Sequence, residues 1–324
     1  MTRFFGGKLA QYALVLFVTI SLNFILPRAM PGSPIGFLVG EEVGSLTPAE
    51  RERVLRAVGL DRPLHEQYLS YLGGIARGDL GYSYQRQRPI AEVLADRLPW
   101  TLLLTGIALA LSTLLGVVFG ALAGWRRGRR SDLAALAVFI FLESLPGFWL
   151  AMILVAVFAV QLGIFPTFGA RELYSGLEGT AYWLDIARHL ALPVTTLTLI
   201  TVSATFLTMR ASMLSVLGEE YVTVARGKGL RERQVLFGHA VRNALLPVAT
   251  VFLLNLGQTV AGATVIETVF SYPGVGRLMY EAVLARDYPT LQGGFLVITL
   301  SIVAGNLLAD LAYPLLDPRV TRRG

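Results

Sequence analysis

Long apolar runs alternate with shorter polar segments along almost the whole chain. Six runs are long enough for a helix that crosses a bilayer, which needs about 20 mostly apolar residues. They cover residues 9–28, 100–124, 133–161, 190–214, 244–266 and 290–315. The pattern predicts an all-α polytopic membrane protein with six transmembrane helices, organised as one membrane domain over residues 1–324.

The first run begins like a signal peptide, because Arg3 and Lys8 precede it. Its apolar region is longer than the 7–15 residues or so that are usual for a signal peptide. The sequence LPRAMPGSP that follows also has no clear A-x-A cleavage site. We therefore expect this run to be an uncleaved membrane anchor.

Basic residues set the expected orientation. If the N-terminus is inside, the inner segments carry fourteen Arg and Lys residues and the two short outer loops carry four. This matches the positive-inside bias of membrane proteins. The remaining outer segment, residues 29–99, holds many arginines but is long enough to be translocated regardless of charge. We expect both termini in the cytoplasm.

The outer segment 29–99 is predicted to form an extracytoplasmic helical cap between spans 1 and 2. Thr47, Pro48 and Glu50 are typical of a helix N-terminus, and Gly59 can end that helix. A second helix is expected over about 63–76, where apolar side chains recur every four residues.

The outer segment 267–289 contains SYPGVGRLMYEAVLARDYP. Pro273 and Gly274 predict a turn, and a short helix then runs to about Arg286. We expect this helix to lie at the membrane surface.

Composition supports a membrane protein, since 54% of the 324 residues are hydrophobic and only 15% are charged. Soluble domains carry roughly 25% charged residues. The absence of cysteine excludes disulfides and thiolate metal sites, and the three histidines lack metal-ligand spacing. The net charge of +6 comes from basic residues that flank apolar runs, so we expect no nucleic-acid partner.

The connection over residues 216–243 is charged and carries its own helical pattern. A short helix fits Glu220 to Arg226, and Gly229 then permits a sharp turn. A second helix runs into the fifth span, where Pro247 removes a backbone donor and can kink the chain.

The first of these helices is expected to place Tyr221, Val224 and Ala225 on one face. Two short helices at an angle make a projection that fits a groove on a cytoplasmic protein. They also fit an amphipathic segment on the lipid surface, with Arg226 and Arg231 near phosphates. The residues alone leave both interpretations open.

This segment resembles the EAA loop of bacterial ABC-importer permeases. Gly229 matches the near-invariant glycine of that loop, Glu220 and Ala225 match the positions that name it, and Leu246-Pro247 follows at the expected distance. Further blocks resemble, in order, the B-type subunit of the dipeptide/oligopeptide/nickel permeases. They are PGSP (31–34), GLDRPLHEQY (59–68), RGDLGYS (77–83), ETVFSYPGVGRL (267–278), ARDYP (285–289) and NLLADLAYPLLDPR (306–319).

The chain departs from this family at two places. PGSP stands where PGDP is commoner, and Val224 stands where alanine is commoner. Neither departure removes the resemblance, which covers essentially the whole chain.

The resemblance implies a non-catalytic permease core over residues 100–316, with 216–243 as a cytoplasmic coupling loop. Its expected partners in the cell inner membrane are a second homologous permease subunit, two ATPase subunits, an extracytoplasmic substrate-binding protein and the lipid bilayer. The implied cargo is di- or oligopeptides, with nickel, glutathione or oligosaccharides as alternatives. The implied ATPase-docking residues are Glu220, Tyr221, Ala225, Lys228, Gly229, Leu246 and Pro247.

The chain cannot form a P-loop, because its only lysines, Lys8 and Lys228, lack the required glycine spacing. We therefore expect no cofactor in this chain, with ATP and Mg bound by the partner ATPase subunits.

Polar groups inside the predicted spans are further candidates, because an ionisable group in hydrocarbon is costly. Glu143, three residues before Pro146, fits either the translocation path or a structural hydrogen bond. Asp310 is expected to be structural, and Arg210 is expected to extend to the membrane surface.

Gly116, Gly120 and Gly124 form a GxxxGxxxG pattern typical of close helix packing. The pattern fits either a partner subunit or a helix of the same chain.

The sequence argues against two other classes of membrane protein. An ion-coupled secondary transporter would need an internal repeat and several intramembrane acids, yet only Glu143 lies deep in a span. A membrane-embedded enzyme would need a cluster of catalytic side chains, and the sequence shows no such cluster.

Overall fold

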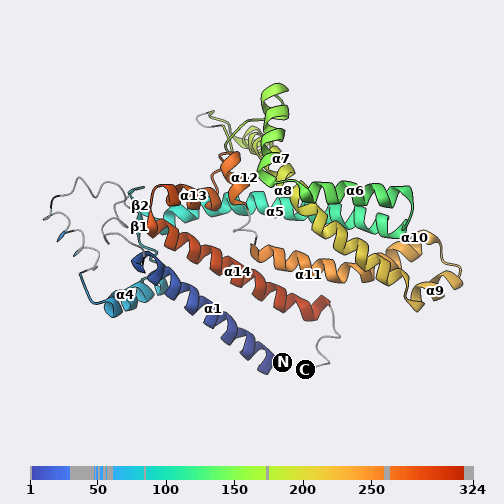
Figure 1. The fold of residues 1–324 in the computed structure, drawn as a ribbon, viewed down its shortest axis with the longest axis horizontal. Helices are drawn as coiled ribbons and strands as arrows, with labels where there is room; N and C mark the ends of the chain where they lie inside the picture. The colour runs from blue at the N-terminus through green and yellow to red at the C-terminus, as the bar shows by residue number, and fades with distance from the viewer. Residues whose placement is uncertain are drawn as a thin grey trace. The chain divides into compact units, whose positions relative to one another are not determined.

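The computed structural model describes residues 2–29, 47, 49, 52–53, 56, 61–83, 85–172, 175–258 and 263–316. Helices dominate this described part, with one short two-stranded hairpin (Figure 1). The chain divides into two compact units, Met1–Thr101 with Pro273–Val303, and Leu102–Tyr272 with Ala304–Gly324. Two long helices, α5 (Ile90–Trp125) and α14 (Tyr288–Leu316), begin in the first unit and end in the second.

The first unit joins the N-terminal helix to the start of α14. Besides the first parts of α5 and α14 it contains α1 (Thr2–Ala29), α4 (Leu64–Ala76), β1 (Tyr82–Ser83), β2 (Arg88–Pro89) and α13 (Val275–Leu284). The Phe24 ring of α1 meets the Tyr68 ring of α4 edge-on, with centroids 5.1 Å apart. The Gln292 amide of α14 donates to the Asn23 carbonyl of α1 at 2.6 Å. Helix α1 is therefore fixed on two sides.

The β1–β2 hairpin is held to the turn between α13 and α14. The Ser83 hydroxyl donates to the Asp287 carboxylate at 2.6 Å, and the Thr290 hydroxyl donates to the same carboxylate at 2.7 Å. All three side chains are buried. Beside them, the half-buried Arg86 pairs with Glu281 of α13 at 2.8 Å. Because buried polar groups are stable only when hydrogen-bonded, this network ties hairpin and turn together.

Two helices expected in the outer segments are present. The helix predicted over 63–76 is α4, and the helix predicted to run to about Arg286 is α13. The helix predicted from Thr47 and the block PGSP fall largely or wholly outside the described residues.

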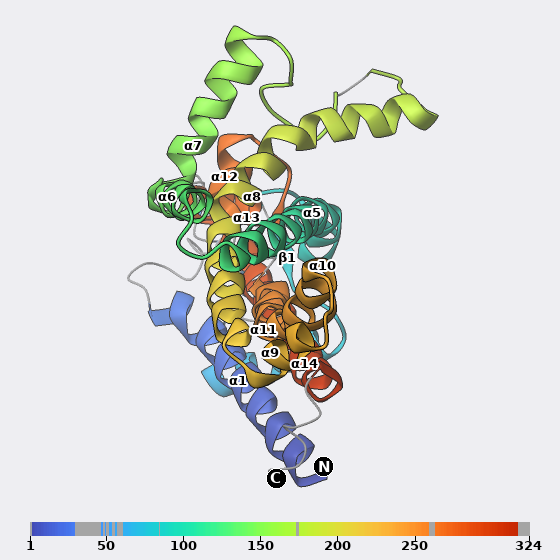
Figure 2. The same cartoon turned by 90° about the vertical axis from the view of Figure 1, so that its right-hand side faces the viewer.

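The second unit is organised around one long buried helix, α8 (Gly179–Leu217). Helix α8 contacts α6, α7, α11 and α12, and Figure 2 shows it passing among them. The other elements of the unit are α6 (Arg130–Ser144), α7 (Gly147–Leu154), the π-helix η2 (Val155–Gln161), α9 (Glu220–Gly227), α10 (Glu232–Gln234), the π-helix η3 (Val235–Val241), α11 (Arg242–Gln258) and α12 (Thr264–Val269).

The GxxxGxxxG stripe of α5 packs against α8 of the same chain. A Cβ added at Gly116 would lie 2.6 Å from the Thr205 Cβ, and one at Gly120 would lie 2.7 Å from the Phe206 carbonyl oxygen. The third glycine, Gly124, approaches Met213 in the same way. Any larger side chain would push the two helices apart, so the stripe serves packing within the chain.

Among the described residues, four helices are long and apolar enough to cross a bilayer. They are Ile90–Trp125, Gly179–Leu217, Glu232–Leu256 and Tyr288–Ala312. Each contains most of one predicted run, and α8 begins eleven residues before the predicted start at 190. The predicted fifth run extended to 266, whereas residues 264–266 belong to the separate helix α12. In α1 the apolar stretch Ala10–Ile25 is shorter than these four.

The predicted span 133–161 is broken into two helices, α6 and α7 with η2, which meet at an angle of 99°. The break lies at Leu145 and Pro146. Leu145 has an extended backbone with ψ 130°, the conformation that a following proline favours. Proline also lacks the N–H that would continue the helix. The two pieces count as a fifth span only if together they cross the membrane.

Candidate functional site

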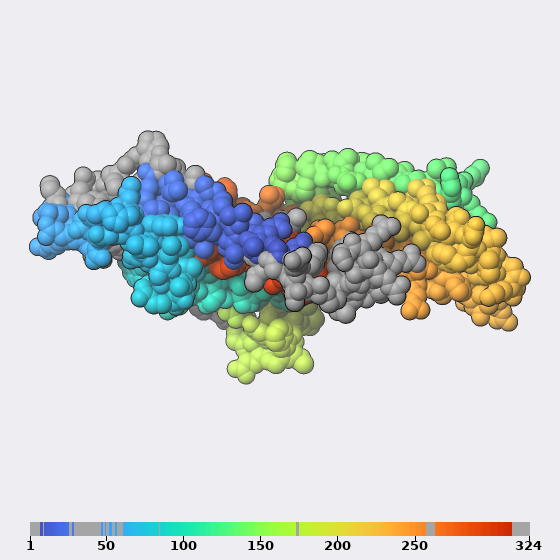
Figure 3. Space-filling view, turned by 90° about the horizontal axis from the view of Figure 1, so that it is seen from below, coloured from blue at the N-terminus to red at the C-terminus, as the bar shows by residue number. Residues whose placement is uncertain are grey.

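The loop segment 216–243 forms the helix–turn–helix that the sequence predicts, at the surface of the second unit (Figure 3). Helix α9 ends at Gly227, and Gly229 has a φ of +75°. The Gly229 amide donates to the Arg226 carbonyl at 2.9 Å and closes the turn. No other atom lies within 4 Å of the place of a Gly229 Cβ. The backbone angle, not crowding, therefore requires glycine here.

The inward side of α9 carries Val222 and Ala225. Both are buried with Val235 of η3, whereas Tyr221 and Val224 are 39% and 54% exposed. Of the three residues predicted to share one face, Tyr221, Val224 and Ala225, only Ala225 is buried, because the end of α5 covers that side of the helix. Trp125 at that end packs on this cluster.

The outward surface of α9 is therefore apolar at its centre and charged at its ends. Tyr221 and Val224 stand one turn apart, and the exposed Glu220 and Lys228 lie at either end. Phe237 of η3 is a further exposed apolar side chain, 64% accessible. An exposed apolar patch with a charged rim is typical of a protein-binding surface.

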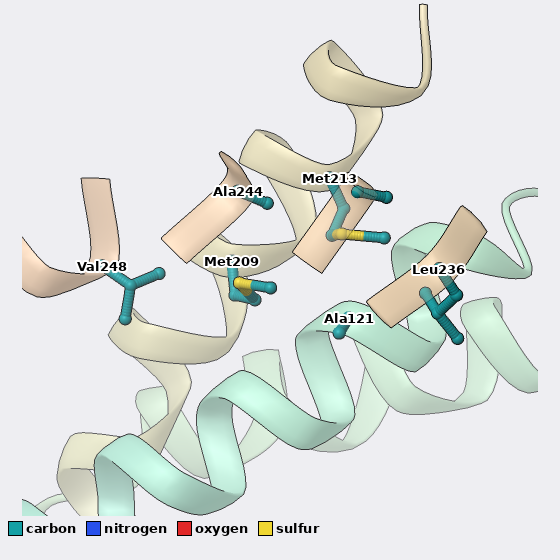
Figure 4. Close-up of a cluster of buried hydrophobic side chains, with 7 residues drawn as sticks. Ala121, Met209, Met213, Leu236, Ala244 and Val248 are labelled. Atoms are coloured by element: carbon teal, nitrogen blue, oxygen red, sulfur yellow. The ribbon is translucent and has the colours of Figure 1, made fainter. Parts of the chain in front are cut away.

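Contacts beneath this surface fix the loop to the helices. The Arg226 guanidinium lies 5.4 Å from the centre of the Trp125 ring of α5. It also pairs with Glu232 of α10 at 3.5 Å across the turn. The second half of the loop joins α8 and α5 through a buried cluster (Figure 4). The cluster consists of Ala121, Met209, Met213, Leu236, Ala240, Ala244 and Val248.

Leu246 and Pro247 lie outside the loop itself. Both are exposed on α11, beyond the π-helix η3. Pro247 does not break this segment, since Glu232–Leu256 continues as one helix.

Arg210, expected to extend to the membrane surface, forms an ion pair inside the second unit. Its guanidinium binds Asp132 of α6 through two hydrogen bonds, of 2.7 Å from Nε and 2.9 Å from Nη2. Asp132 is 1% exposed, and its carboxylate also accepts from the Gly128 amide at 3.0 Å. The two partners are 78 residues apart in sequence, so no local pattern indicates the pair.

Glu143 is exposed on the last turn of α6, next to the break at Pro146. Within the described part of the chain its carboxylate has no hydrogen bond or ion pair. Asp310 is half-buried in α14. Among the described residues no group of three His, Cys, Asp or Glu side chains is placed to hold a metal ion.

In the first unit, Glu281 of α13 forms ion pairs with Arg86 and Arg277, both at 2.8 Å. Partial burial alone would raise the pKa of Glu281. The hydrogen bonds and charges of the two arginines outweigh it and hold the pKa below its ordinary value.

Two family profiles match the chain. The profile described as "Binding-protein-dependent transport system inner membrane component" matches residues 116–322, and the one for the N-terminal part of such membrane components matches residues 1–105.

Curated relatives match over nearly the full length. The chain is 35% identical to the di/tripeptide transport system permease protein DppB of Pseudomonas aeruginosa, covering 99% of both chains. It is 36% identical to the dipeptide permease DppB of Escherichia coli, covering 93% of this chain and 94% of that one. It is 34% identical to the oligopeptide permease AppB of Bacillus subtilis, covering 96% of each.

A solved structure has a similar fold. The crystal structure of an amino acid ABC transporter with histidines matches with a TM-score of 0.50 at 14% identity. The match covers 68% of this chain and 93% of that one.

Proposed function

The chain belongs to the family of binding-protein-dependent transport system inner membrane components, and we propose that it is the permease subunit of an ATP-driven importer of di- or oligopeptides. The observation that carries this proposal is the full-length similarity to permeases named for dipeptides and oligopeptides. The relatives' names favour peptides over nickel, glutathione or oligosaccharides. The chain sits in the cell inner membrane as a multi-pass protein.

The loop segment 216–243 is the proposed docking surface for an ATPase subunit. Tyr221 and Val224 supply its exposed apolar centre, Glu220 and Lys228 its charged rim, and Gly229 the bend. Ala225 acts from below, since its buried side chain holds α9 against the end of α5. Leu246 and Pro247 form the edge of this proposed surface on the exposed side of α11.

The remaining partners follow from the same function. A second permease subunit completes the path, an extracytoplasmic binding protein delivers the peptide, and two ATPase subunits bind ATP and Mg. The proposed layout has six spans, both termini in the cytoplasm and residues 29–99 outside. Glu143, exposed beside a break in a span, is the proposed contact of the path with the peptide amino group.

Reconstitution tests the proposal. The chain is co-expressed with a candidate second permease, ATPase subunits and a binding protein from its source organism, and the purified complex is placed in liposomes. Uptake of labelled di- and oligopeptides should require both ATP and the binding protein. Uptake driven by a proton or sodium gradient without ATP would instead support a secondary transporter. ATP-dependent uptake of nickel or an oligosaccharide, but not of peptides, would overturn the substrate assignment alone.

A further inference from the structure

A buried ion pair inside the second unit joins two helices far apart in sequence. Arg210 of α8 and Asp132 in the first turn of α6 form a two-point ion pair. The side chains are 19% and 1% exposed, and the Gly128 amide completes the carboxylate's partners. A two-point guanidinium–carboxylate contact fixes both distance and direction, which a single contact does not.

On the α8 side, Arg210 lies within the body that carries the loop segment 216–243. The neighbouring side chains Met209 and Met213 are fully buried against η3 and α11, and Figure 4 shows them in one cluster with Ala121, Leu236 and Ala244. A Cβ at Gly120 of α5 would lie 3.2 Å from the Arg210 backbone nitrogen. Close packing of this kind transmits displacement, because protein interiors have low compressibility.

On the α6 side, Asp132 lies in the first turn of the helix. Helix α6 ends just before the break, where the chain turns by 99° into α7. Along its length α6 meets α8 through the stacked rings of Phe139 and Phe206, with centroids 4.2 Å apart. The Ser203 hydroxyl also donates to the Phe139 carbonyl at 2.7 Å. Ring stacking resists separation of the helices better than it resists sliding. The ion pair therefore fixes the position of α6 along the axis of α8.

We propose that Arg210 and Asp132 are positioning residues that carry the movement of the ATPase-docking loop into the broken span α6–α7. This inference rests on the proposed function, in which an ATPase subunit grips the loop. The route runs from α9 and η3 to α8, across the ion pair to the first turn of α6, and along α6 to the break at Pro146. A shift of the loop then changes the angle at the break instead of being lost as sliding between α6 and α8.

The test uses the complete transporter with its partner subunits in liposomes, and it measures peptide transported per ATP hydrolysed. Asp132→Asn keeps an acceptor for Gly128 but removes the charge that holds Arg210. The paired variant Asp132→Asn with Arg210→Gln removes both charges and so leaves no unpaired buried charge. The matched control is Asp96→Asn, which breaks an exposed ion pair of α5 with Arg88.

We expect each variant that assembles to retain bound ATPase subunits and ATP hydrolysis. Its peptide transported per ATP should fall about fivefold or more, the size of an ordinary coupling between sites. The control should transport as much peptide per ATP hydrolysed as the wild type. If Asp132→Asn fails to assemble because Arg210 is left buried and unpaired, the paired variant carries the test. Wild-type coupling in an assembled variant of the pair would overturn the inference.

A measurement on the unaltered pair gives a second test. Spin labels on Ser131→Cys and Ser215→Cys report the separation of the start of α6 and the end of α8, both exposed, in a chain without other cysteines. The mean distance between the labels should be the same in the nucleotide-free and the ATP-trapped transporter. In the paired variant the distribution of distances should become broader. A nucleotide-dependent change in the otherwise wild-type protein would contradict the inference. Loss of ATPase copurification with the wild-type chain would instead contradict the proposed function.

Discussion

At the scale of single residues, the backbone angle of Gly229 sets the shape of the proposed docking loop. Its φ of +75° lies in the left-handed region, which costs an ordinary residue roughly 1–2 kcal/mol. We expect Gly229→Val to insert in the membrane but to lose much of its ATP-driven uptake. Gly229→Asn, whose side chain tolerates this conformation, should keep most of it. Uptake by the valine variant equal to that of the wild type would show that transport does not need this bend.

The ion pairs of Glu281 predict a pH dependence of stability. Because its pKa is depressed in the folded protein, Glu281 adds stability above its unfolded pKa, and this contribution is lost as pH falls through the folded pKa. The thermal unfolding midpoint of the purified chain should therefore fall as pH drops below the ordinary value of 4.5. Glu281→Gln should lower the midpoint at neutral pH and make this fall shallower.

The Glu281 measurement is a series of melting curves at stepped pH in detergent. Arg86→Met should flatten the same pH dependence, since Arg86 is the carboxylate's hydrogen-bonded partner from the hairpin. If both variants lose stability with acid as steeply as the wild type, these ion pairs do not set the pH dependence.

A variant at Glu143 distinguishes a role in the translocation path from a role in helix packing. Its exposed carboxylate has no partner within the described residues of this chain, so Glu143→Gln should leave the unfolding midpoint unchanged. If it meets the amino group of the peptide, uptake of amine-bearing substrates should fall, because glutamine keeps the shape but not the charge. Normal uptake of such peptides by an assembled Glu143→Gln transporter would remove Glu143 from the path.

At the scale of helices, the close approach of α5 to α8 predicts a sharp contrast between two glycines of α5. A Cβ at Gly120 would meet the backbone oxygen of Phe206 at 2.7 Å, whereas Gly106 has no such neighbour within 4 Å. We expect Gly120→Ala to cost roughly 1–3 kcal/mol, as overpacked sites do, and to lower the unfolding midpoint. Gly106→Ala, in the same helix, is the matched control. Equal midpoints for the two variants would contradict this packing.

Helices were predictable because their signals are local. The length of the apolar runs and the turn at Gly229 indicated most of the long helices and the bend of the loop, and Pro146 marks the break of α6 from α7. Contacts between distant segments carried no such signal. The inward face of α9 depends on Trp125 at the end of another helix, and Arg210 meets Asp132 across 78 residues. Sequence periodicity shows that a face is apolar but not which neighbour covers it.

At the scale of the whole molecule, function depends on which parts of the chain face each side of the membrane. In the proposed function, the loop segment 216–243 reaches an ATPase in the cytoplasm and the segment 29–99 reaches a binding protein outside. The asymmetry of basic residues supports this proposed orientation. Orientation can be measured directly, because the chain has no cysteine of its own.

Single cysteines at Ser45 and Gln234 test the orientation. We expect an impermeant thiol reagent to label Ser45→Cys in intact spheroplasts, and to label Gln234→Cys only after the membrane is permeabilised. Gln234 is exposed on α10, so failure to label it in intact cells would reflect the membrane and not burial in the fold. Its labelling after permeabilisation is the internal control. Labelling of Gln234→Cys but not Ser45→Cys in intact spheroplasts would invert the topology, and the loop could then not reach an ATPase in the cytoplasm.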